Sequence, residues 1–209
     1  MLVTHGLIKS ENDGCIISGE EYMEKIANKF ADWLVCCGAP GDNREIYAYA
    51  VECLLNTVLI FSVIIVVSII LGKFLPTLLW ILFFLPVRHT SGGLHAPNHI
   101  GCFLFSVSVG IGCMFLAPLL VNKPSVFFAG ICASIVIIFV FAPVIHSNHP
   151  LSEQSIQKTK KHARIIILLE SAFMILLYFL TKDSVLAFSA LLGVLSATLS
   201  TFAGRLLNQ

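Results

Sequence analysis

The chain has 209 residues and a net charge of +1, and 57% of its residues are hydrophobic while only 12% are charged. An average soluble domain is about 25% charged, so this composition, with a mean hydropathy of +0.89, excludes an ordinary soluble domain and predicts a protein embedded in lipid. The near-neutral charge also lacks the basic footprint of a nucleic-acid-binding protein.

The N-terminal part of the chain is polar, and eight of the twelve carboxylates lie within its first 50 residues. We expect residues 1–45 to form a cytoplasmic or interfacial head and residues 46–209 to form a membrane domain. Within the head, residues 18–37 predict an amphipathic helix. Ser18 and Glu21 have the spacing of a capping box, and apolar residues recur every three or four positions after them.

Six apolar segments follow the head and predict an all-α membrane protein. Most of them approach or reach the roughly 20 residues that cross a hydrocarbon core. Segment 74–87 is shorter, about 21 Å as a helix, and contains Pro76 and Pro86, so it could cross the bilayer or re-enter on the same side. The expected segments are residues 50–71, 74–87, 101–121, 125–145, 165–180 and 184–203.

The distribution of lysine and arginine predicts the orientation of these segments. With the N-terminus inside, ten basic residues fall on the inner side and three, Lys73, Lys123 and Lys182, on the outer side. Cytoplasmic loops carry the excess of positive charge, and the first fifteen residues lack the pattern of a signal peptide. We therefore expect a multi-pass protein with both termini in the cytoplasm.

The inner loop at residues 88–102 concentrates the residues that could perform chemistry. It reads RHTSGGLHAPNHIGC, with one arginine, three histidines, a glycine pair and Cys102. Ionisable groups are costly at a membrane boundary, so function is the default hypothesis, although a polar turn with a buried thiol is the simpler alternative. Cys102 falls at the start of the third segment, where the positive helix end favours a thiolate nucleophile.

Spacing alone does not choose the histidine that would activate Cys102. On a continuous helix His95 would lie about 10.5 Å away, too far for a hydrogen bond. The glycines Gly92 and Gly93 would allow the backbone to fold back and bring His95 closer. His99, three residues from Cys102, is the stronger partner by helical spacing.

Residues 88–106 resemble the signature of the AgrB-like family, the accessory gene regulator B membrane cysteine endopeptidases. The resemblance rests on seven residues from Arg88 to His95, seven more to Cys102 and a hydroxyl residue, Ser106, four positions further on. The glycine pair and the order of an amphipathic head, six hydrophobic segments and a basic loop also match. The resemblance implies that Cys102 is the nucleophile and His95 the general base.

The resemblance also implies the substrate and the compartment. The substrate would be an AgrD-like signal propeptide for bacterial quorum sensing, cut near its acidic C-terminal tail on the cytoplasmic side and cyclised to a thiolactone or lactone. A thioester on Cys102 would preserve the energy of the cleaved bond for exchange with a substrate thiol. A site at the inner boundary of the bilayer would limit competing water. No cofactor is implied.

The other residues of the signature have two interpretations each. Arg88 could pair with the acidic tail or anchor at the lipid headgroups. Gly92 and Gly93 could donate N–H groups to an oxyanion, or only form the turn. Ser106 could bond to the catalytic pair or to its own helix. No carboxylate occurs between residues 52 and 153, so we expect a Cys–His dyad without a third acidic member.

Four further points remain open from the sequence. His95, His99 and Cys102 could join another histidine in a tetrahedral zinc site. The interrupted apolar segments also suit a transporter or exporter. The basic run at residues 158–164 could anchor on anionic lipid, the simpler interpretation, or dock an acidic peptide. Small residues in segment 184–203 would allow a homodimer.

Overall fold

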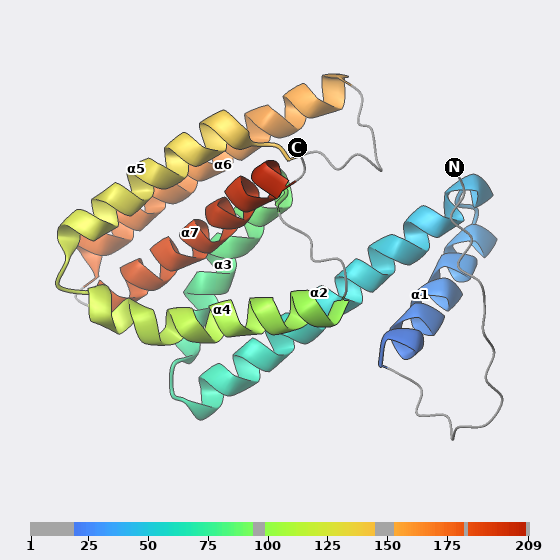
Figure 1. The fold of residues 1–209 in the computed structure, drawn as a ribbon, viewed down its shortest axis with the longest axis horizontal. Coiled ribbons are helices and arrows are strands. Elements are labelled where there is room, and N and C mark those ends of the chain that lie inside the picture. The colour runs from blue at the N-terminus through green and yellow to red at the C-terminus, as the bar shows by residue number, and fades with distance from the viewer. Residues whose placement is uncertain (1–18, 94–98, 145–152, 182–183, 208–209) are drawn as a thin grey trace. The chain divides into compact units, whose positions relative to one another are not determined.

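The computed structural model describes residues 19–93, 99–144, 153–181 and 184–207, and contains no strand among them. The predicted all-α class is therefore confirmed (Figure 1). The elements are α1 (Gly19–Cys36), the short 3-10 helix η1 (Gly41–Asn43), α2 (Arg44–Ile70), α3 (Phe74–Ser91), α4 (His99–Leu120), α5 (Pro124–Phe141), α6 (Glu153–Leu180) and α7 (Ser184–Leu207).

Six of the described helices, α2 to α7, are long and apolar enough to cross a membrane. The chain is therefore a multi-pass membrane protein. The short segment expected at residues 74–87 continues as α3 to Ser91 and reaches 18 residues. Pro86 lies inside this helix, and the carbonyl oxygen of Pro86 accepts a hydrogen bond from the Thr90 hydroxyl at 2.8 Å. By its length, α3 can span the bilayer.

Several helix boundaries differ from those expected; α2, for example, begins at Arg44 rather than at residue 50. α5 ends at Phe141 rather than near residue 145, because Pro143 forces Ala142 into an extended conformation with φ −82° and ψ 146°. α6 begins at Glu153 rather than at residue 165. Its first turns are rich in glutamine and lysine, which are good helix formers without being apolar. The basic run at residues 158–164 therefore lies on a helix and not in a loop.

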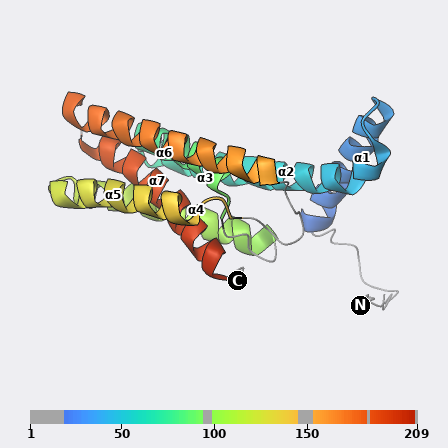
Figure 2. The same cartoon turned by 90° about the horizontal axis from the view of Figure 1, so that it is seen from above.

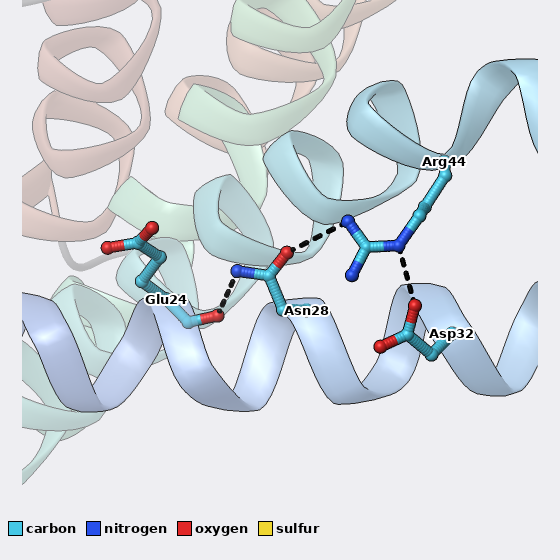
Figure 3. A network of polar contacts seen from close by, with 4 residues as sticks. All are labelled: Glu24, Asn28, Asp32 and Arg44. Atoms are coloured by element: carbon cyan, nitrogen blue, oxygen red, sulfur yellow. Dashed lines mark hydrogen bonds and ion pairs between the residues drawn. The ribbon is translucent and has the colours of Figure 1, made fainter.

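Contacts divide the chain into two units, Met1–Asn56 and Thr57–Gln209. In the first unit, Arg44 at the start of α2 forms side-chain hydrogen bonds to α1 (Figure 3). Its Nε donates to Asp32 at 2.6 Å and its Nη1 donates to the side-chain oxygen of Asn28 at 3.2 Å. The amide of Asn28 in turn donates to the backbone carbonyl of Glu24 at 2.9 Å. The separation of head and membrane domain at residue 45 stays a prediction.

In the second unit, α7 is the central helix. Of its most apolar 18-residue window, 61% is buried inside the protein, against 17–33% for the other five spans. It packs against α3, α4, α5 and α6, and the α3–α7 pair is the most extensive contact (Figure 1 and Figure 2). The side chains that α7 buries are mostly small, which lets neighbouring helices approach closely.

Gly193 marks the closest approach of α7 to α3. A Cβ atom on Gly193 would overlap the backbone oxygen of Trp80 and would lie 3.2 Å from the backbone nitrogen of Phe84. Backbone atoms cannot move aside as the end of a flexible side chain can. The separation of α3 and α7 is therefore set by the absence of a side chain at residue 193.

We expect Gly193→Ala to lower the free energy of unfolding by about 1–3 kcal/mol, because the added methyl group must push α3 and α7 apart. Denaturant unfolding in lipid nanodiscs measures the change. The matched control is Gly112→Ala in α4, where a Cβ atom would meet nothing within 4 Å. There the better helix propensity of alanine should stabilise by up to about 1 kcal/mol. Equal effects of the two substitutions would contradict the close α3–α7 contact.

The link between α1 and α2 should weaken in acid. The hydrogen bond from Arg44 lowers the pKa of Asp32 below its ordinary value of 3.8. The pair therefore stabilises the folded state at pH values above 3.8, and this contribution is lost as the pH falls through the depressed value. In a Trp80→Phe background, the emission of Trp33 in α1 should report this loss during acid titration.

Two variants test this interpretation of the titration. Asp32→Asn should abolish the acid transition, since it removes the titrating group. Glu24→Gln should leave it unchanged, because Glu24 contributes only its backbone carbonyl to the network. An identical transition in Asp32→Asn and in the unmodified chain would refute the assignment.

Candidate functional site

The C-terminal end of α3 forms one border of the predicted site. Arg88 lies in its last turn, and Gly92 caps the helix with a φ of +69°, a conformation that favours glycine. The N–H of Gly92 donates to the Arg88 carbonyl at 3.2 Å. A Cβ atom on Gly92 would lie 2.8 Å from the carbonyl oxygen of Val144. Gly92 is therefore required both by its backbone conformation and by the close approach of the segment after α5.

Gly93 accommodates the side chain of Arg88. Its φ is +155°, and a Cβ atom there would overlap the guanidinium group of Arg88 and lie 2.8 Å from Oγ of Ser200 in α7. The guanidinium group therefore rests against the Cα atom of Gly93 and is directed toward α7. The absence of a side chain at Gly92 thus accommodates Val144, and its absence at Gly93 accommodates Arg88.

The N-terminal end of α4 forms the other border. α4 begins at His99, so Cys102 lies in its first turn and Ser106 lies one turn further, and both side chains are half-buried. Cys102 is a free thiol. An electrostatic interaction between Arg88 and Cys102 links the end of α3 to the start of α4.

The centre of the predicted loop is not described. His95 lies at residues 94–98, outside the described residues, and only the backbone of His99 is placed. The choice between these two histidines as partner of Cys102 therefore stays a prediction. The described residues contain no group of three potential metal ligands, but several histidines that the zinc alternative would use lie outside them.

Hydroxyl groups of α7 support the end of α3. Oγ1 of Thr201 lies 2.7 Å from Oγ of Ser91 and 3.1 Å from the carbonyl oxygen of Gly92. Both hydroxyl side chains are fully buried, at 0% exposure. Sequence reasoning missed Thr201, which lies 110 residues from Ser91. The available signal was the recurrence of serine and threonine along the otherwise apolar segment 184–203.

The basic face of α6 forms a second polar feature. Lys160, Lys161 and Arg164 line a groove of about 250 Å³ together with Gln157 and two apolar residues. Nη2 of Arg164 donates to the carbonyl of Phe139 at 3.1 Å, and its guanidinium carbon lies 4.9 Å from the centre of the Phe139 ring. Arg164 is thereby attached to the end of α5, whereas the exposed Lys161 remains available to the surroundings.

Comparison with known proteins identifies relatives across most of the chain. The sequence model of the family described as Accessory gene regulator B matches residues 23–202. An AgrB-like protein of Listeria innocua is 24% identical over 181 residues, which are 85% of this chain and 89% of that protein. One of Listeria monocytogenes serotype 4a is 28% identical over 185 residues, again 85% and 89%. One of Lactiplantibacillus plantarum is 23% identical over 59% of this chain and 62% of that protein. No solved structure matches the chain.

Proposed function

The chain belongs to the accessory gene regulator B family, which supports a role in accessory gene regulator quorum-sensing processing, and on this premise we propose that it is a membrane-embedded cysteine endopeptidase. The proposed substrate is an AgrD-like signal propeptide, cleaved on the cytoplasmic side near its acidic C-terminal tail. One observation carries this proposal. An electrostatic interaction between Arg88 at the end of α3 and Cys102 in the first turn of α4 supports it.

Cys102 is the proposed nucleophile. Its sulfur attacks the carbonyl carbon of the scissile peptide bond, and the C–N bond breaks to release the acidic tail. His95 is proposed to take the thiol proton and deliver it to the leaving amine. The propeptide remains as a thioester on Cys102. A thiol or hydroxyl group of the propeptide then attacks this thioester. The attack closes the ring, and Cys102 leaves and takes up the proton of the attacking group to become a free thiol again.

The position of Arg88 supports a role next to the nucleophile. Its side chain is half-buried against Gly93, and the guanidinium group has the fork of donors that binds carboxylates well. We propose that Arg88 binds a carboxylate of the acidic tail, which would hold the scissile bond near Cys102. This role takes the place of the alternative in which Arg88 reaches out to the lipid headgroups.

The glycine pair is proposed to shape the turn. The N–H of Gly92 already donates to the Arg88 carbonyl, so it is not available to stabilise an oxyanion. This supports the simpler of the two interpretations for Gly92. Ser106, half-buried one turn beyond Cys102 on α4, is proposed to support the site from within the membrane. Both termini are proposed to lie in the cytoplasm, as the charge distribution favours.

Reconstitution in liposomes with a candidate propeptide tests the proposed mechanism, with products followed by mass spectrometry. Cys102→Ala should abolish cleavage, and His95→Ala should reduce the rate at least about 100-fold, since general-base catalysis typically contributes that much. His99→Ala should retain cleavage.

The matched control is Cys113→Ala, which removes a half-buried thiol from the same helix, where the Cys113 sulfur lies 3.7 Å from Oγ of Ser196. It should cleave like the unmodified protein. Cleavage that survives Cys102→Ala would eliminate the thioester mechanism. Loss of cleavage in His99→Ala but not in His95→Ala would reassign the base.

A further inference from the structure

The end of α3, after which the chain continues toward His95, is held by a side chain of α7 and by the backbone of the segment after α5. Thr201 of α7 contacts both the hydroxyl of Ser91 and the carbonyl of Gly92. From the segment after α5, the N–H of Val144 donates to the Ser91 carbonyl at 2.9 Å. Ser91 and Gly92, the last helical residue of α3 and its cap, are thus bonded to α7 and to the segment after α5.

The hydroxyl groups of Thr201 and Ser91 lie close to each other and to backbone carbonyls. Each hydroxyl group has one proton. Oγ1 of Thr201 lies 3.1 Å from the Gly92 carbonyl and 3.0 Å from the Ala197 carbonyl of its own helix. Oγ of Ser91 lies 2.7 Å from Oγ1 of Thr201 and 2.7 Å from the Val87 carbonyl. Both side chains are buried, at 0% exposure, so no water replaces a lost partner. A buried polar group without a partner costs more than the bond itself contributes. The Gly92 carbonyl is thus bonded by the hydroxyl groups of Thr201 and Ser91, which hold it against α7.

The position of the Gly92 carbonyl determines the direction in which the loop begins. Gly92 has a positive φ, which reverses the chain at the point where it leaves α3. His95 follows only three residues later, so a rotation at Gly92 is passed on over a short distance. A displacement of about 1 Å between a catalytic group and its target can cost about 100-fold in rate.

We propose that Thr201 is a positioning residue, which fixes the end of α3 at Ser91 and Gly92 and thereby the start of the proposed catalytic loop. This inference rests on the proposed function. Thr201 acts through Ser91 and Gly92 and needs no contact with the substrate. Its loss therefore lowers kcat for propeptide cleavage and leaves KM nearly unchanged.

Three variants of α7 separate positioning from general stability. Thr201→Val keeps the shape of the side chain and removes its hydrogen bonds. Thr201→Ser keeps the hydroxyl and removes one methyl group. Thr198→Val is the matched control, because Thr198 is equally buried in the same helix but lies 3.5 Å from Ser134 of α5 and not at the loop. Cleavage kinetics and melting temperatures are measured in proteoliposomes.

The expected result is a fall in kcat of at least about 10-fold for Thr201→Val, with KM within two-fold of the unmodified protein. Thr201→Ser should restore most of the rate. Thr198→Val should cleave normally even if its melting temperature falls as much as that of Thr201→Val. Equal kcat for Thr201→Val and Thr198→Val at similar melting temperatures would overturn the proposal, as would failure of Thr201→Ser to restore the rate.

Two additions keep this test decisive. If Thr201→Val does not fold, Thr201→Ala removes the same hydrogen bonds with a smaller side chain, and an unchanged kcat in that variant would overturn the proposal. Cys102→Ala is measured in the same series. If it still cleaves, the proposed peptidase mechanism fails, whereas an inactive Cys102→Ala together with a fully active Thr201→Val refutes only the role of Thr201.

Discussion

The close contact between α3 and α7 is the constraint on which the membrane unit depends. In lipid no water is available to bind polar groups, so each must find a partner inside the protein. The missing side chain at Gly193 lets the two helices approach until backbone atoms touch. Further along the same helix pair, the hydroxyl of Thr201 lies 2.7 Å from that of Ser91 in α3.

The candidate site is built on the end of this helix pair. Because α7 holds the end of α3, the glycine pair that follows has a defined position, and the guanidinium group of Arg88 rests against Gly93. The site therefore combines a rigid border with a short loop. Rigid support of this kind is what a nucleophile and its base require, because they must meet within hydrogen-bonding distance.

The sequence predicts the helix boundaries well where the length of an apolar run determines them. It predicts them less well where polar helix-forming residues extend the helix. The apolar runs indicate six spans, but the start of α6 was misplaced because its first turns are polar. The family signature links Arg88 to Cys102, and in the structure the two interact electrostatically. The Thr201–Ser91 contact could not be predicted, since it joins residues 110 positions apart. The recurring serines and threonines of segment 184–203 indicate polar contacts but do not identify the partners.

The contact between Val144 and the end of α3 is made almost entirely by main-chain atoms. Its hydrogen bond joins the Val144 N–H to the Ser91 carbonyl, and its only strict demand on a side chain is that Gly92 has none. Such a hydrogen bond tolerates changes of side chain, because almost any residue supplies the same amide and carbonyl. The contact between the segments after α3 and after α5 therefore constrains the residue at position 92 far more than the residue at position 144.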